Sequence, residues 1–331
     1  MEPTVRPDPA AEGAAPPPPS RWRWLRWPFA LATVAAIVWV VPLRDRGGEP
    51  GVLTIVHRAR VDVLAWLLGA YVLASVTWAL RWRALLPLAG LRPTLLRVWR
   101  VTLESQAAAA LIPTAISGDA VRMTAMTRDG GTVAEVAATL VLDRMVGFGA
   151  LLLIALTFVT LAPDAPARWR LALGLALLAV AAGFALLRTG WIGRVRWFAA
   201  SRVGRAVMPA LEVASGPRAL GAVARSAFWG LAVAAINFSV IRAVVGALGG
   251  RPHTEASFFT HTAMIFVGVL LPGVPGTWEA MWIFFLGGAG VSASVALGAC
   301  VLMRAYAYAL ALLGALSLAW GAKRAPPGEA P

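Results

Sequence analysis

Long apolar runs separated by arginine-rich segments most limit how this chain can fold. About 20 apolar residues are needed to cross a hydrocarbon core of about 30 Å, and six runs meet or approach that length. Of the 331 residues, 59% are hydrophobic and only 14% are charged, which excludes an ordinary soluble domain. We therefore predict an all-α polytopic membrane protein. The predicted spans cover about 28–43, 62–80, 133–161, 171–187, 222–247 and 292–320.

The net charge of +14 comes almost entirely from arginine, since Lys323 is the only lysine. In a soluble protein this charge would indicate nucleic acid. Here the arginines lie between apolar runs, where they set topology and contact anionic lipid, so no nucleic-acid partner is expected. Cys300 is the only cysteine, which excludes an intrachain disulfide. We predict no metal and no cofactor.

The composition divides the chain into three parts. Residues 1–27 are predicted to be a disordered Pro/Ala-rich tail that ends in an interfacial Arg/Trp segment. Residues 28–322 form one membrane domain, and 323–331 are a short cytoplasmic tail. Within the membrane domain we expect two repeats, at about 62–161 and 222–320.

The arginine-rich loops at 81–100 and 188–218 are predicted to be cytoplasmic. If both lie inside, the short apolar segment at about 101–112 begins and ends on the same side and cannot cross. It must enter the membrane and return at Pro113. By the same reasoning, the segment at about 256–271 enters from the outside. The expected topology has six crossings, two re-entrant hairpins in an inverted repeat, and cytoplasmic N- and C-termini.

Each predicted hairpin contains a break that is followed by an acid. A long span that carries one arginine comes after each hairpin. Asp119 and Arg144 are 25 residues apart, and so are Glu279 and Arg304. Each arginine lies about 11 or 12 residues into its span, or roughly 17–18 Å at 1.5 Å per residue, which is close to the midplane. The residues predicted to make the breaks are Pro113, Gly118, Pro272 and Gly276.

An arginine near the midplane costs at least about 2.5–3.5 kcal/mol on insertion scales, and such residues usually mark a transport pathway. We therefore predict that Arg144 and Arg304 bind the phosphate of a substrate. A purely structural ion pair between each arginine and an intramembrane acid is the alternative.

Asp119, Arg122 and Glu279 are predicted to gate the cavity or bind substrate, and Asp143 is predicted to orient Arg144. Because Asp119 and Glu279 follow the breaks, helix capping is an equally good interpretation, and the two roles are compatible. The sequence contains no credible nucleophile and base pair and no phosphate-binding glycine loop, so we do not expect an enzyme.

In this order, these residues resemble the flippase-like membrane domain of lysylphosphatidylglycerol synthases, the bacterial multiple-peptide-resistance proteins. The similarity covers roughly 60–320. Ser117 stands where such families usually carry glycine, and Thr277-Trp278-Glu279 stands where they often carry Gly-x-Arg-Glu. The residues that carry the resemblance are Arg81-Trp82-Arg83, Pro113 with Gly118, Asp119 and Arg122, Leu142-Asp143-Arg144, and Pro272 with Gly276 and Glu279.

The resemblance implies a translocase for a phospholipid or a polyprenyl-linked lipid in the bacterial cytoplasmic membrane. Because only a few residues follow Lys323, we expect no aminoacyl transferase domain, and a separate lipid-modifying enzyme would be a partner. Two alternatives stay open: a membrane enzyme acting on a lipid-linked substrate, and a non-transporting partner of a separate synthase.

Overall fold

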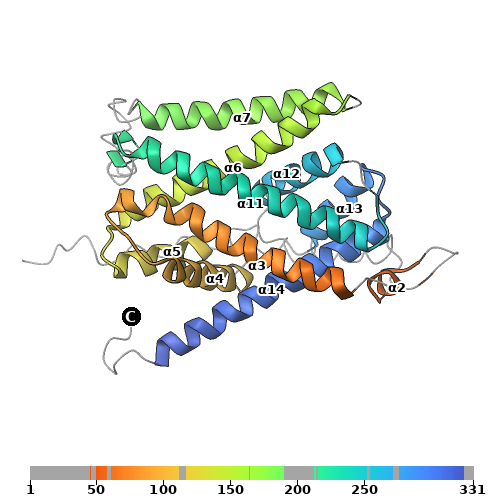
Figure 1. Ribbon diagram of the computed structural model, residues 1–331, viewed down its shortest axis with the longest axis horizontal. Coiled ribbons are helices and arrows are strands. Elements are labelled where there is room, and N and C mark those ends of the chain that lie inside the picture. Colours follow the sequence, from red (N-terminus) through yellow and green to blue (C-terminus); the bar gives the residue numbers. More distant parts are fainter. Residues whose placement is uncertain are drawn as a thin grey trace, which may run out of the picture.

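The computed structural model describes residues 45, 50–57, 61–111, 117–163, 165–189, 212–213, 215–251, 254–270 and 276–323. The described residues are almost entirely helical and contain no strand (Figure 1). The elements are α2 (Val52–His57), α3 (Val61–Arg83), the 3-10 turn η2 (Leu86–Ala89), α4 (Leu95–Leu111), α5 (Ser117–Arg128), α6 (Val133–Leu161), α7 (Ala167–Arg188), α11 (Ala219–Ala247), α12 (Thr254–Leu270), α13 (Thr277–Gly287) and α14 (Ala293–Lys323).

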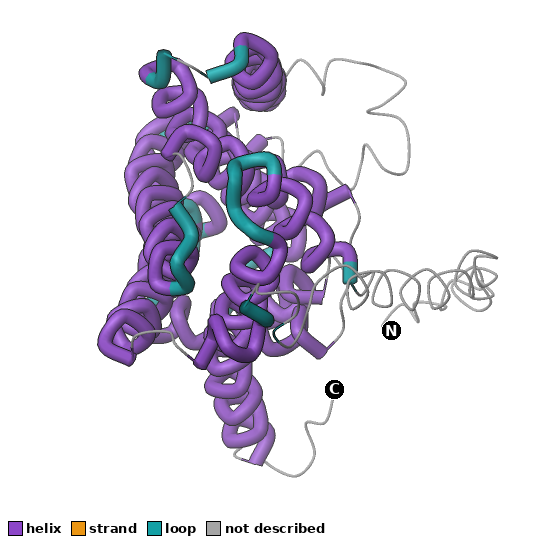
Figure 2. The backbone as a smooth tube through the Cα atoms, turned by 90° about the vertical axis from the view of Figure 1, so that its right-hand side faces the viewer, coloured by secondary structure: helices purple, strands orange, loops and turns teal. Residues whose placement is uncertain are grey.

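Five helices in the described part of the chain are long and apolar enough to cross a membrane, namely α3, α6, α7, α11 and α14. They coincide with five of the six predicted spans, and the prediction of an all-α polytopic membrane protein is confirmed. The remaining predicted span, 28–43, lies outside the described residues. α7 lies at the edge of the bundle, and the C-terminal end of α14 projects beyond the other helices (Figure 2).

The start of α6 shows how local sequence sets a helix boundary. Gly130 has a φ of 103°, which favours glycine, and it turns the chain after α5. Thr132 then caps α6: its side chain accepts a hydrogen bond from the Glu135 backbone N–H at 3.3 Å. The Glu135 carboxylate in turn accepts from the Thr132 backbone N–H at 3.3 Å. This reciprocal capping box fixes the first residue of the helix.

The order long, short, short, long occurs twice, first as α3 to α6 and then as α11 to α14. α4 and α12 have 17 residues each, or about 26 Å at 1.5 Å per residue, which falls short of a hydrocarbon core of about 30 Å. The long helices α3 and α11 run in opposite directions, and so do α6 and α14 (Figure 1). The α4–α5 pair and the α12–α13 pair lie towards opposite ends of the molecule.

The predicted breaks differ in what the structure describes. Pro113 and Pro272 lie outside the described residues. Gly276 has a φ of 84°, which favours glycine, and it directly precedes α13. Gly118 lies inside α5, one residue after the helix starts. A Cβ there would lie 2.9 Å from the Ser105 carbonyl oxygen, so glycine allows α5 to approach α4 closely.

Different kinds of contact hold α4 and α12, the first short helix of each repeat, in place. Where α14 crosses α4, a Cβ at Gly314 would overlap the carbonyl oxygen of Leu103. Beside this crossing, the Glu104 carboxylate accepts hydrogen bonds from Arg100 at 2.9 Å and from Ser317 at 2.8 Å. The corresponding arm α12 contacts α6 through aromatic rings instead. Phe158 and Phe258 stack with their centroids 3.9 Å apart, and Phe148 contacts Phe266 at 5.0 Å.

Candidate functional site

Arg144 and Asp119 form an ion pair between α6 and the first turn of α5. The Arg144 Nε donates a hydrogen bond to Asp119 Oδ2 at 3.0 Å, and Nη2 donates to the same oxygen. The Arg144 side chain is 45% exposed and that of Asp119 is 26% exposed, so the pair is open on one side. The sequence spacing of 25 residues therefore corresponds to a contact in space.

Arg304 and Glu279 form the equivalent ion pair between α14 and the first turn of α13. The Arg304 Nη1 lies 2.8 Å from Glu279 Oε1, with side-chain exposures of 37% and 18%. The second oxygen, Oε2, is buried and has no hydrogen-bond partner among the described residues. Glu279 lies in the first turn of α13, which begins at Thr277 directly after the N-cap residue Gly276.

Asp143 lies next to Arg144 on α6 but is engaged by two other arginines. Its carboxylate accepts from Arg81 Nε at 2.7 Å and from Arg81 Nη2 at 2.9 Å. The Arg122 Nη1 lies 3.4 Å from Asp143 Oδ2. Both oxygens of Asp143 are therefore engaged by Arg81 and Arg122, and a role of Asp143 in orienting Arg144 stays a prediction. We call Arg81, Arg122 and Asp143 the buried triad, since their exposures are 9%, 3% and 1%.

Tryptophan rings fix Arg122 within the buried triad. The guanidinium carbon lies 4.8 Å from the ring centroid of Trp78 and 4.8 Å from that of Trp82, a distance typical of cation–π contacts. Trp82 is itself held, because its indole N–H donates to the Thr139 hydroxyl at 3.2 Å. Arg122, which was predicted to gate the cavity or bind substrate, is therefore buried and stacked against α3.

Glycines make room for the guanidinium of Arg81. A Cβ at Gly147 would lie 2.6 Å from Arg81 Nη1 and 3.1 Å from its Cζ. On α11, a Cβ at Gly230 would lie 3.5 Å from Arg81 Cδ and 3.2 Å from the Ala150 Cβ. The sequence analysis placed Arg81 in a cytoplasmic loop, but it belongs to the last turn of α3 and reaches into the bundle. Spacing gives no hint of its partner, which is 62 residues away.

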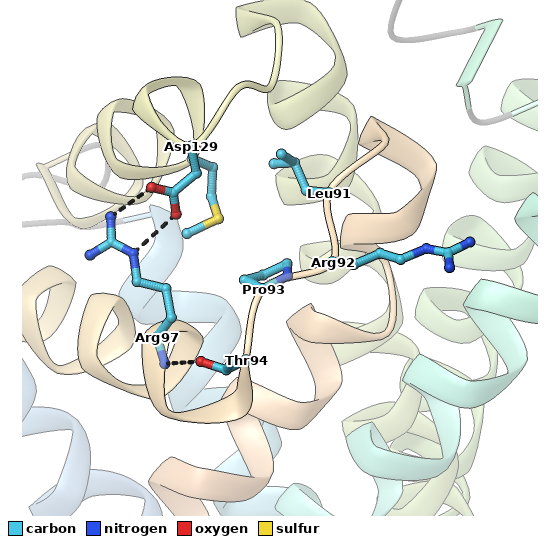
Figure 3. Close-up of a pocket in the computed structure, with 7 residues that line it drawn as sticks. Leu91, Arg92, Pro93, Thr94, Arg97 and Asp129 are labelled. Carbon is cyan, nitrogen blue, oxygen red and sulfur yellow. Dashed lines mark hydrogen bonds and ion pairs between the residues drawn. The ribbon is translucent and has the colours of Figure 1, made fainter.

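A groove of about 560 Å³ lies at the end of α5, beside the loop that leads into α4 (Figure 3). Arg97 donates to both carboxylate oxygens of Asp129, at 3.0 and 3.1 Å. The hydrogen bond to Asp129 raises the pKa of the Arg97 guanidinium. None of the predicted site residues lines this groove. It is lined by Leu91, Arg92, Pro93, Thr94, Arg97, Met126 and Asp129.

The ionisable side chains of the site do not form a metal centre. Among the described residues, no group of three or more histidine, cysteine, aspartate or glutamate side chains could hold a metal ion. The site is instead a set of arginine–carboxylate contacts that joins α3, α5 and α6 in the first repeat and α13 with α14 in the second.

Long apolar helices that enclose arginine–carboxylate pairs define a polytopic membrane protein with a charged interior. The chain matches the family model of the lysylphosphatidylglycerol synthase TM region over residues 27–314, and it therefore belongs to that family. The matched range contains both ion pairs and the whole buried triad. No curated protein matches the chain.

Proposed function

We propose that this protein is a lipid translocase, which carries the polar head of an anionic or lipid-linked amphiphile across the membrane while its tails stay in lipid. The observation that carries the proposal is the pair of equivalent ion pairs, Asp119 with Arg144 and Glu279 with Arg304. Membership of a family of lipid-related membrane proteins supports a lipid as the substrate.

The depth of the two arginines supports this function. Arg144 is the twelfth residue of α6, and Arg304 is the twelfth residue of α14. Each therefore lies about 17 Å from the start of its helix, roughly half of a hydrocarbon core. Because a charge at this depth is costly, the presence of an arginine there favours a pathway for a charged group.

The exposure of the pairs supports exchange of partners. Without substrate, each arginine is neutralised by its own acid, which lowers the cost of placing it in the membrane. The side chains of Arg144 and Arg304 stay partly exposed, at 45% and 37%. A phosphate, like a carboxylate, presents anionic oxygens that can accept two hydrogen bonds from one guanidinium, so it can replace the acid on the arginine. We propose that each acid is released from its arginine when a headgroup binds and pairs with it again when the headgroup leaves.

The arrangement of the two repeats supports alternating access. The α4–α5 and α12–α13 units lie towards opposite ends, and corresponding long helices are antiparallel (Figure 1). Inverted repeats of this kind let one half move against the other around a central site. We propose that α4–α5 enters from the cytoplasmic side and α12–α13 from outside, with a phospholipid or polyprenyl-linked lipid supplied by a separate lipid-modifying enzyme.

The decisive experiment compares single and double substitutions in proteoliposomes that contain fluorescent phosphatidylglycerol. Arg144→Leu should abolish translocation, and so should Arg304→Leu. Asp119→Leu combined with Arg144→Leu removes both charges of the pair, so this double variant should be more stable than Arg144→Leu alone. Translocation should still be absent, because the phosphate-binding guanidinium is gone.

The matched control is the ion pair Arg97 and Asp129, which has similar geometry outside the site. Leucine at both positions should leave translocation unchanged. If the double substitution of Asp119 and Arg144 transports lipid at the parent rate, the pair is only structural and the proposed function is wrong.

A further inference from the structure

The two repeats differ at the positions beside their equivalent ion pairs. Three residues after the acid, the first repeat has Arg122 and the second has Trp282. One residue before the arginine, the first repeat has Asp143 and the second has Met303. The buried triad therefore has no counterpart in the second repeat, although the Asp119 and Glu279 pairs do correspond. A function that depends on Arg122 belongs to one side of the protein only.

The charges of the buried triad do not cancel. Two guanidiniums, of Arg81 and Arg122, share the single carboxylate of Asp143. The nearby pair of Asp119 and Arg144 is already neutral. Burying an uncompensated charge is expensive, so one further negative charge would complete this cluster.

The two arginines use different atoms of their guanidiniums. Arg81 presents the edge made of Nε and Nη2 to Asp143 and forms two hydrogen bonds with it. Arg122 contacts Asp143 only through Nη1, at 3.4 Å. The Nε and Nη2 of Arg122 are buried and have no hydrogen-bond partner among the described residues. The edge that forms paired hydrogen bonds with two oxygens of one anion is therefore unused.

The surroundings of Arg122 hold that edge in place and add one donor. Two indole rings, of Trp78 and Trp82, lie against the guanidinium, each with its centroid 4.8 Å from the guanidinium carbon. The indole N–H of Trp78 is also buried without a hydrogen-bond partner in the part of the chain that the structure describes. The Nε and Nη2 of Arg122 and the indole N–H of Trp78 are all donors without acceptors, and an oxyanion can satisfy such donors.

We propose that the Nε–Nη2 edge of Arg122, with the Trp78 indole N–H, is an oxyanion site that binds a phosphodiester at the first repeat only. A phosphodiester carries one negative charge, which completes the buried triad, and two free oxygens, which match the edge. The inference rests on the proposed function in naming a lipid headgroup as the source, and free phosphate is the other source of the same chemistry. Headgroup capture is then one-sided, although both repeats carry an ion pair for transport.

The test measures binding in a phosphate-free detergent, by calorimetric titration with dihexanoylphosphatidylglycerol and with dihexanoylglycerol, which lacks the phosphate. The parent should bind only the phosphate-containing lipid. Arg122→Lys keeps the charge but loses the planar edge, so binding should weaken by about tenfold or more. Trp78→Phe keeps an aromatic face and removes one donor, so binding should weaken several-fold. Arg97→Lys, outside the site, should bind like the parent.

Inorganic phosphate identifies the source of the anion. If phosphate competes with the lipid in the parent but not in Arg122→Lys, the site binds the oxyanion itself. If lipid binding depends on Arg122 but phosphate does not compete with it, the site binds the lipid headgroup. Equal affinity of the parent and Arg122→Lys for dihexanoylphosphatidylglycerol overturns the inference. If the lysine variant does not fold, equal affinity of the parent and Trp78→Phe overturns it.

Binding and transport separate the two proposals. Normal lipid binding by Arg122→Lys, with transport lost in Arg144→Leu and Arg304→Leu, would overturn this inference alone. Lipid binding lost in Arg122→Lys, with normal transport by the two leucine variants, would overturn the proposed function alone.

Discussion

Alanine at Gly147 should destabilise the protein although it improves the helix. Gly147 and Gly149 both lie within α6, and alanine in a helix interior is favoured over glycine by about 1 kcal/mol. At Gly149 the new Cβ would lie 3.7 Å from the Val180 side chain, an ordinary contact. At Gly147 it would lie 2.6 Å from Arg81 Nη1, which is too close for both atoms to stay in place.

The cost of the Gly147→Ala change follows from what holds Arg81. A flexible arginine tip would normally move aside, but this one is bound to Asp143 at 2.7 and 2.9 Å within the bundle. Breaking a buried ion pair costs about 3–5 kcal/mol, and Arg122 remains beside Asp143, which favours the lower value. The net loss is about 2 kcal/mol against the parent, whereas Gly149→Ala should gain about 1 kcal/mol.

Equilibrium unfolding of the variants in one mixed-detergent system gives these differences directly. Removing Arg81 reverses the sign of the effect: in an Arg81→Leu background, Gly147→Ala should stabilise by about 1 kcal/mol, because only the helix preference remains. If Gly147→Ala is as stable as Gly149→Ala in the parent background, the guanidinium is not fixed against α6 and the account of the buried triad is refuted.

Gly314→Ala should destabilise by about 1–3 kcal/mol through overpacking, because its Cβ would overlap the Leu103 carbonyl, whereas Gly174→Ala, with no atom within 4 Å of the new Cβ, should not. Thermal unfolding of the two variants checks the difference, and equal melting temperatures would contradict the close α4–α14 crossing. Thr132→Ala should cost about 1 kcal/mol and Thr132→Ser almost nothing, because only a hydroxyl accepts from the Glu135 N–H. Equilibrium unfolding separates these variants, and equal losses would show that the cap does not stabilise α6.

Helix positions were predictable where the signal is local. The span predicted at 133–161 agrees with α6 at both ends, because a capping box starts the helix and the chain leaves it at Ala162. The short segments were predicted at about 101–112 and 256–271, but the helices α4 and α12 begin earlier, at Leu95 and Thr254. The first turns of α4 carry polar residues, which an analysis of apolar runs omits.

Pairings were predictable only where the repeat itself indicated them. The shared spacing drew attention to Asp119 with Arg144, and an ion pair was one of the two interpretations. The contact between Arg81 and Asp143 joins helices whose adjacency no local pattern reveals. An arginine at the end of an apolar run indicates topology in most sequences, so its inward orientation is known only from the packing of α3 against α6.

Two side chains in the first turns of α5 contact two consecutive residues of α6. Asp119 binds Arg144, and Arg122 contacts Asp143, so two neighbouring polar contacts join the helices. A sliding or rotation of α5 against α6 therefore has to separate both contacts. Among the described residues, one such contact joins α13 to α14, from Arg304 to Glu279. A motion of α5 against α6 must therefore separate polar contacts at two residues of α6, whereas the same motion of α13 against α14 must separate the contact at Arg304.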